Sequence, residues 1–130
     1  MSKNHTTTSR SKLKQIVDVW AAEDWDWVCD GCADVSYALW LIGQKLEWNC
    51  RIITGNVKVG ESHFGHVWLN IDGKIFDPVA HANGYKVQKY SPMSGQEAEH
   101  LKVVKEVFGV VDDEFYGFDA DDAIKEFQLT

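Results

Sequence analysis

The dipeptide Asp72-Gly73 constrains the fold more than any other feature, because it separates two segments rich in strand-forming residues. An Asp-Gly pair between such segments is typical of a two-residue β-hairpin turn. We therefore predict a hairpin with one strand over residues 66–71 and a return strand over Lys74-Ile-Phe-Asp77. With a two-residue turn, Trp68 faces Asp77 across the two strands.

This register also brings His66 close to Asp77. His66 lies two residues from Trp68 on the same face of its strand. The backbones of diagonal neighbours on one face of a sheet are roughly 7–8 Å apart, which long side chains can bridge. We therefore expect a hydrogen bond between the imidazole of His66 and the carboxylate of Asp77. A turn of odd length would shift the register by one residue and separate the two side chains.

The rest of the chain indicates an α+β domain, with helices before and after an antiparallel sheet. Apolar side chains recur at helical spacing near both ends of the chain, and β-rich stretches are concentrated in the middle. A stripe of Val35, Leu39, Ile42 and Leu46 is typical of a helix that buries one face. The predicted helices cover residues 11–22 and 32–46, a stretch from Leu101 that stops before Val111, and a last segment capped by Asp119. Further strands are predicted over residues 51–54, ending at Gly55-Asn56, and over residues 85–90.

Length and composition indicate a single globular domain, since the chain has 130 residues, of which 45% are hydrophobic and 25% charged. We place that domain at residues 11–130 and expect residues 1–10 to form a flexible tail. No apolar run reaches the roughly 20 residues of a membrane helix, and the first residues lack the apolar stretch of a secretory signal. We therefore expect a cytoplasmic protein that does not bind membranes.

The net charge of −7 comes entirely from the C-terminal third of the chain. Residues 97–130 hold ten acidic and three basic side chains, whereas residues 1–96 hold ten of each. This distribution argues against nucleic-acid binding, which needs concentrated positive charge. A solvated acidic surface that helps solubility is the simpler interpretation, and a docking surface for a basic protein is the alternative.

The three cysteines are an odd number, and without an export signal we expect reduced thiols rather than disulfides. Cys32 is the candidate nucleophile, because it is expected at the start of a helix that Asp30 or Gly31 can cap. Unpaired N–H groups at a helix start can hold an oxyanion, and an adjacent imidazolium favours the reactive thiolate. The negative charges of Asp30 and Asp34 oppose ionisation of a nearby thiol. Cys50 begins a predicted buried strand and is expected to be an inert core thiol.

Four short motifs occur in order between residues 28 and 80. They are Gly31-Cys32-x-x-x-Ser36-x-x-Leu39, Arg51-Ile-Ile-Thr-Gly55, His66-Val-Trp68 and Phe76-Asp77-Pro78. As an ordered set they resemble the transglutaminase-like branch of the papain-like cysteine protease superfamily. The resemblance implies a papain-like (transglutaminase-core) domain, in which the helix that carries the nucleophile packs on an antiparallel β-sheet, with further helices at both ends of the chain.

The resemblance also implies a chemistry. Cys32 would be the nucleophile, His66 the general base and acid, and Asp77 the residue that orients the imidazole. The expected reaction is acyl transfer from an amide or peptide bond of a protein or peptide substrate through a thioester, without a cofactor. Water is the favoured acceptor, which gives a peptidase or amidase, and transamidation is the alternative.

Two features depart from the pattern of this family. Residues 46–50 replace the Gly-Ile-Pro that commonly precedes the arginine. The polar side chain that completes the oxyanion hole of papain-like enzymes has no obvious counterpart, and the nearest candidates are the indole N–H groups of Trp25 and Trp27. Trp68 shares the predicted face of His66 and Asp77 and is a candidate wall of the cleft.

Other interpretations use the same residues. Cys29, Cys32, His63 and His66 form a Cys2His2 set that suits a structural zinc ion, although His63 and His66 would point to opposite faces of one strand. The pair Cys29-x-x-Cys32 also resembles a redox motif, and Cys32 alone could be a buried core residue. From a different class, the domain could be a non-catalytic interaction module with the same fold.

The remaining aromatic and histidine residues are expected to have structural roles. The core is predicted to include Trp20, Trp40 and Trp48. We expect solvent-exposed positions for His5 and His100 and a loop position for His81.

Overall fold

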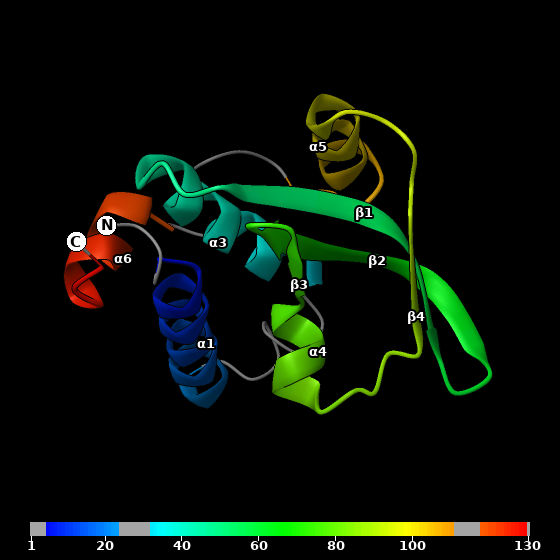
Figure 1. The fold of residues 1–130 in the computed structure, drawn as a ribbon, viewed down its shortest axis with the longest axis horizontal. Coiled ribbons are helices and arrows are strands. Elements are labelled where there is room, and N and C mark those ends of the chain that lie inside the picture. Colours follow the sequence, from blue (N-terminus) through cyan, green and yellow to red (C-terminus); the bar gives the residue numbers. More distant parts are fainter. Residues whose placement is uncertain (1–4, 24–31, 111–117, 130) are drawn as a thin grey trace.

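The computed structural model describes residues 5–23, 32–110 and 118–129. These residues form five helices and a curled four-stranded antiparallel sheet, so the predicted α+β class is confirmed (Figure 1). None of these helices is long and apolar enough to cross a membrane. The helices are α1 (His5–Glu23), α3 (Cys32–Lys45), α4 (Pro78–Asn83), α5 (Glu97–Glu106) and α6 (Ala120–Glu126). The strands are β1 (Cys50–Val59), β2 (Ser62–Ile71), β3 (Lys74–Phe76) and β4 (Lys89–Pro92).

The turn at Asp72-Gly73 has the predicted register. Ile71 pairs with Lys74, and Leu69 pairs with Phe76. Both turn residues have positive φ angles, 50° at Asp72 and 85° at Gly73, as a type I′ hairpin turn requires. Asp and Gly tolerate this conformation, which explains why the pair fixes a two-residue turn.

The prediction that the strand ends at Gly55-Asn56 is wrong. Strand β1 continues through these residues to Val59 and pairs along its whole length with β2. Gly55 does not end the strand but leaves room for a neighbouring one. A Cβ atom there would lie 2.2 Å from the backbone oxygen of Ser91 and 2.7 Å from Cα of Pro92. A glycine is therefore needed for the close approach of β4, which pairs with β1 at residues 55–58.

The return strand is shorter than predicted, because β3 ends at Phe76 and Asp77 instead caps the start of α4. The Asp77 carboxylate accepts a hydrogen bond from the backbone N–H of Ala80, and Pro78 occupies the first helical position. His81 therefore lies in a helix and not in a loop as predicted. Its Nε2 is 3.2 Å from Oδ1 of Asp18 on α1, which joins these two helices.

Helix α3 lies in the centre of the core and packs against β1 and β2. Val35, Leu39 and Ile42 are fully buried, as the stripe predicted, and Leu46 follows the end of the helix. Helix α6 packs against α3, and α1 packs against α4 below the sheet in the view of Figure 1. The predicted helices at both ends of the chain are confirmed, although α1 begins at His5 and not at residue 11. As predicted, the core contacts include Trp20, Trp40 and Trp48, all partly buried.

Helix α5 covers the edge of β1 that β4 leaves free, above the sheet in Figure 1. The backbone N–H of Thr54 donates to Nδ1 of His100 at 2.9 Å, and the N–H of Ile52 donates to Glu97 at 3.0 Å. These side chains pair strand N–H groups that no neighbouring strand reaches. The prediction that His100 faces solvent is therefore wrong, because only 3% of the residue is exposed. The side chain of His5 lies outside the part of the chain that can be described.

Candidate active site

The centre of the site is a hydrogen bond between His66 and Asp77, which confirms the contact predicted from the hairpin register. Nε2 of His66 lies 2.8 Å from Oδ2 of Asp77, and each side chain is only 4% exposed. The two residues come from β2 and from the residue after β3, which the short turn brings together. The imidazole therefore has a fixed orientation in a site from which water is largely excluded.

Both oxygens of the Asp77 carboxylate are occupied. Oδ1 accepts the N–H of Ala80 at the start of α4, at 3.2 Å. Oδ2 accepts from His66 and also from the hydroxyl of Tyr90, at 3.0 Å. The same carboxylate therefore caps a helix and orients the histidine, so the backbone of α4 holds the rotamer that the imidazole needs.

Tyr90 is a site residue that the sequence did not reveal. It lies on β4, and its ring meets that of Trp68 edge to face with 4.9 Å between the centroids. Burial, and then the charge and hydrogen bond of Asp77, raise the pKa of the Tyr90 phenol, so the hydroxyl remains protonated and donates. The sequence signal for Tyr90 was weak. The strand predicted over residues 85–90 overlaps β4 (Lys89–Pro92) only at residues 89 and 90, and the pairing of β4 with β1 depends on Gly55.

Trp68 lies on the predicted face with His66 and forms the inner wall of the site. Its ring stacks on the imidazole with an interplanar angle of 26° and 6.2 Å between centroids. Only 2% of the tryptophan is exposed. It therefore supports the ring of His66 from one side and carries no open surface for a ligand.

Cys32 joins this pair from α3. It is the first residue of the helix, its thiol is free and partly exposed, and it lies close enough to His66 to raise the pKa of the imidazole. One turn later, the hydroxyl of Ser36 donates to the carbonyl of Val67, the neighbour of His66, at 3.3 Å. This bond fixes the first turns of α3 beside β2. Because Asp77 holds Nε2 of His66, Nδ1 is the ring nitrogen left for the thiol.

The charge state of His66 follows from these contacts. Burial alone would lower its pKa, but the hydrogen bond and negative charge of Asp77, together with the nearby Cys32, raise the pKa of His66 from 6.5 to about 9. The imidazole is therefore an imidazolium at neutral pH. A cysteine sulfur, an imidazole and a carboxylate that lie close together can carry out nucleophilic catalysis with proton transfer. The catalytic roles of the three residues remain predictions.

Of the residues that the sequence predicts around the Cys32 thiol, some lie outside the described part of the chain. Asp34 lies in the first turn of α3, where partial burial raises the pKa of its carboxyl. The other residues predicted around the thiol, Asp30 and Gly31 as helix caps and Trp25 and Trp27 as oxyanion donors, lie outside the described residues.

The zinc site and the redox motif, the two alternatives suggested by the sequence, both need Cys29. This residue also lies outside the described residues. Of the other three zinc candidates, His63 is exposed near one end of β2, whereas His66 is buried and bonded to Asp77. Within residues 5–23, 32–110 and 118–129, no group of three potential metal ligands comes together.

Cys50 is buried, as predicted for a core thiol. It is 3% exposed and lies against Gly43 of α3, where a Cβ atom would be 2.9 Å from the Cβ of Cys50. Burial, together with the charges of Glu97 and Asp72, raises the pKa of the Cys50 thiol to about 12. This thiol is therefore unreactive at neutral pH and serves as an internal reference for Cys32.

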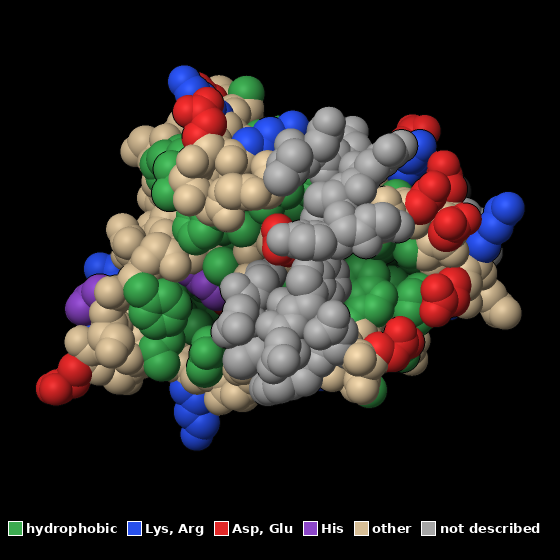
Figure 2. All heavy atoms as spheres, turned by 180° about the vertical axis from the view of Figure 1, so that it is seen from behind, with side chains coloured by type: hydrophobic (Ala, Val, Ile, Leu, Met, Phe, Trp, Pro, Cys, Tyr) green, Lys and Arg blue, Asp and Glu red, His purple; other side chains and the backbone are tan. Residues whose placement is uncertain are grey.

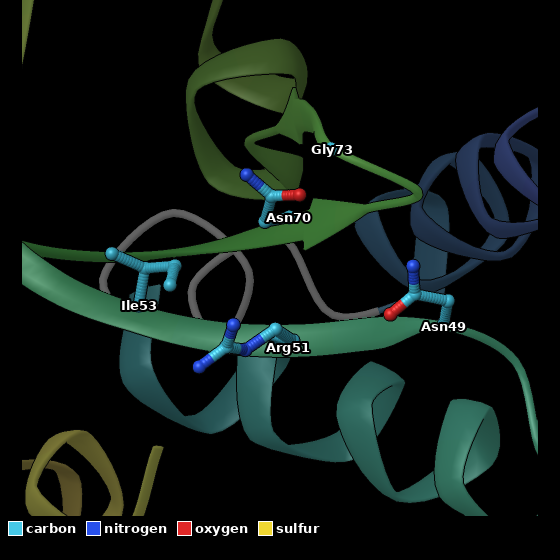
Figure 3. A pocket seen from close by; sticks show the side chains of 5 residues that line it. All are labelled: Asn49, Arg51, Ile53, Asn70 and Gly73. Atoms are coloured by element: carbon cyan, nitrogen blue, oxygen red, sulfur yellow. The ribbon is translucent and has the colours of Figure 1, made fainter. Parts of the chain in front are cut away.

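A shallow hollow of about 300 Å³ lies near the other end of the β1–β2 pair (Figure 3). Among the residues that line it, Ile53 pairs with Trp68, and Arg51 pairs with Asn70 across the two strands. The lining residues are Asn49, Arg51, Ile53, Asn70 and Gly73. This lining contains no nucleophile and no general base, and neither His66 nor Asp77 belongs to it.

Comparisons with models of protein families, with curated proteins and with solved structures found no match to this chain.

Proposed function

We propose that this chain is a transglutaminase-like cysteine enzyme that transfers an acyl group from an amide or peptide bond through a thioester. The observation that carries the proposal is the 2.8 Å hydrogen bond between buried His66 and Asp77, with the free thiol of Cys32 close to the same imidazole. The packing of α3, with Cys32 in its first turn, on β1 and β2 supports a papain-like arrangement. The four ordered motifs support the same family.

In the proposed first step, the proton of the thiol is already on His66, and the Cys32 thiolate attacks the substrate carbonyl. A bond forms between Sγ and the carbonyl carbon, and the carbonyl electrons move to the oxygen. The His66 imidazolium then donates its proton to the leaving nitrogen, the carbon–nitrogen bond breaks, and a free amine and a thioester on Cys32 remain.

The second step restores the enzyme. Neutral His66 removes a proton from water, the resulting hydroxide attacks the thioester, and the sulfur leaves as a thiolate beside the imidazolium. An amine could replace water, which would give transamidation. We favour water as the acceptor, which makes the proposed activity that of a peptidase or amidase. Asp77 keeps Nε2 of the imidazole occupied, which leaves Nδ1 for proton exchange with the sulfur in both steps.

Selective alkylation tests the nucleophile. Brief treatment with substoichiometric iodoacetamide at neutral pH, followed by peptide mapping, should label Cys32 first. Cys50 should remain unlabelled, because it is buried with a raised pKa. His66→Gln should slow the labelling of Cys32 at least tenfold, because the thiolate loses its imidazolium partner.

The alkylation test has a matched control on the same strand. His63→Gln changes an exposed histidine of the same strand and should leave the rate of labelling unchanged. Labelling of Cys29 or Cys50 before Cys32 would count against the proposal, as would equal labelling rates in the wild type and His66→Gln. Stoichiometric metal in the purified protein that is lost in Cys29→Ser would favour the zinc interpretation instead.

A further inference from the structure

The hollow beside Arg51 lies on the face of the sheet that points away from α3 (Figure 3). Ile52 and Leu69 are fully buried in the core, where α3 packs against β1 and β2. Side chains alternate between the two faces along each strand, so Arg51, Ile53 and Asn70 point to the other side. The start of β1 and the end of β2 therefore place these side chains together on the outer face of the sheet.

Three polar side chains of the hollow have no partner within the described part of the chain. The Arg51 guanidinium forms neither an ion pair nor a hydrogen bond with any described residue, and the same holds for the carboxamides of Asn49 and Asn70. A guanidinium has five N–H donors, and each carboxamide adds two donors and an acceptor. The hollow therefore combines many free donors with one positive charge.

The cross-strand neighbours of Arg51 leave its charge without a counterpart. Asn70 lies directly opposite on β2, and Ile75 lies opposite Asn70 on β3. A carboxylate at position 70 would form a cross-strand ion pair with the arginine, but the position holds a neutral amide. The acidic residue of the adjoining turn, Asp72, is not among the residues that line the hollow. A negative charge from outside the chain would therefore find the guanidinium available.

The hollow also offers an apolar contact. Ile53 is only partly exposed and lines the hollow together with the three polar side chains. Ligand sites typically combine an apolar surface with a few polar groups that fix the orientation of the ligand. The volume of about 300 Å³ is at the small end of such sites and suits a group of the size of one amino acid.

The rest of the surface indicates a small anion and not a long one. In the view from behind, the described Lys and Arg side chains are scattered among Asp and Glu and form no continuous patch (Figure 2). The chain has a net charge of −7, which repels a polyanion as a whole. A single guanidinium is matched by a ligand group with a single negative charge.

We propose that this hollow binds a carboxylate that adjoins an apolar carbon chain, as at the C-terminus or in an acidic side chain of a peptide. Arg51 donates two parallel hydrogen bonds to the carboxylate oxygens. The carboxamides of Asn49 and Asn70 donate to the same group or accept a peptide N–H, and Ile53 contacts the carbon chain. The binding does not involve Cys32, so it stands or fails independently of the proposed acyl transfer.

An NMR titration of ¹⁵N-labelled protein with N-acetylleucine tests the site, in a buffer free of carboxylate and phosphate. The shift changes should be largest for the guanidinium of Arg51 and the carboxamides of Asn49 and Asn70. A dissociation constant of roughly 1–10 mM is expected for a ligand of this size. N-acetylleucinamide has almost the same shape without the charge and should bind about tenfold more weakly or worse.

Three variants assign the binding to the arginine. Arg51→Gln should weaken N-acetylleucine about tenfold or more, whereas Arg51→Lys keeps the charge without the planar fork and should have an intermediate effect. Lys58→Gln is the matched control and should keep the wild-type affinity. It removes one positive charge from the same strand, seven residues or about 23 Å away. Arg51 is exposed, so its variants should fold normally, which urea unfolding would check.

A further pair of probes identifies the source of the carboxylate and the outcomes that contradict the proposal. N-acetylglutamic acid 1-amide has its carboxylate on the side chain only. Tighter binding of N-acetylleucine would indicate a peptide C-terminus, tighter binding of the glutamic acid derivative would indicate an acidic side chain, and either result supports the proposal. Equal affinities for N-acetylleucine and its amide, or an unchanged affinity in Arg51→Gln, would overturn it. Tighter binding of inorganic phosphate than of both carboxylates would overturn it as well.

Discussion

The hydroxyl of Tyr90 and the carboxylate of Asp77 form a 3.0 Å hydrogen bond that joins the two edges of the sheet. Asp77 follows β3, and Tyr90 lies on β4, the outermost strands in the order β3-β2-β1-β4. In a flat sheet the outer two of four strands are about 14 Å apart. The bond forms because the sheet is curled (Figure 1) and because the ring of Tyr90 packs against that of Trp68. The curl thus completes the set of partners around the carboxylate.

Replacing Tyr90 with phenylalanine should destabilise the protein by about 1–2 kcal/mol. The substitution keeps the ring against Trp68 but removes a hydrogen bond to a buried carboxylate. Urea unfolding would measure the difference in the free energy of unfolding. Tyr85→Phe is the matched control, because this tyrosine is 43% exposed and its change should cost less than about 0.5 kcal/mol. Equal effects of the two substitutions would contradict the importance of the Tyr90–Asp77 bond.

Asp77→Asn should lower the pKa of His66. In the wild type the carboxylate, with Cys32, outweighs burial and holds this pKa at about 9. Asparagine keeps an oxygen that can cap α4 but removes the negative charge, so burial should then dominate and bring the pKa below its ordinary value of 6.5. NMR titration of the imidazole carbon-bound protons would measure both values. An imidazole that titrates near 6.5 in both proteins would rule out the strong pairing described for this site.

Stability should decrease as the pH rises from about 6.5 to about 9. The pKa of His66 is higher in the folded protein than in the unfolded chain, so the folded state binds more protons in this window. The stabilisation from the charged pair is complete below pH 6.5 and is lost as the pH rises through about 9. Free energies of unfolding for the wild type and His66→Gln, measured across this range, should converge towards the alkaline end. Parallel pH curves would show that the charge on His66 does not contribute.

Gly55→Ala should destabilise the protein by about 3 kcal/mol or detach β4 from β1. The new Cβ would overlap with the backbone of Ser91 and Pro92, which cannot move without loss of the strand pairing. Chemical unfolding would give the loss of stability, and faster exchange of the Tyr90 amide proton would report the detachment. Gly65→Ala, with a contact at 3.6 Å, is the matched control and should cost less than about 1 kcal/mol. Similar stabilities of the two variants would contradict the close approach at Gly55.

The parts of the site that local rules determine could be predicted from the sequence. The Asp72-Gly73 turn requires positive φ angles that few other pairs adopt, so the register and the contact between His66 and Asp77 followed from it. The apolar stripe of α3 likewise predicted a buried helix that begins at Cys32. In both cases the pattern lies within a few consecutive residues.

The parts that depend on distant segments could not be predicted. Gly55 resembles a strand terminator, and only the arrival of β4 shows that it permits a close contact. His100 lies in a helix with an acidic first turn and resembles a surface residue, yet it accepts a hydrogen bond from Thr54, at a strand edge that no local pattern reveals. Tyr90 belongs to the same group, because its partner Asp77 is on the opposite edge of the sheet.

The turn at residues 72 and 73 has a consequence for how this chain can change. Exposed hairpin tips usually tolerate insertions and deletions, and both residues of this turn are exposed. Here, any change of loop length that slips the pairing by one residue would direct Asp77 to the opposite face of the sheet, away from His66. The chemistry of the buried pair is therefore encoded partly in the length of a surface loop that touches neither side chain. For a tag, a linker or a domain fusion, the Gly60-Glu61 turn between β1 and β2 is the safer position, because Asp77 lies beyond it in the chain and keeps its own register with β2.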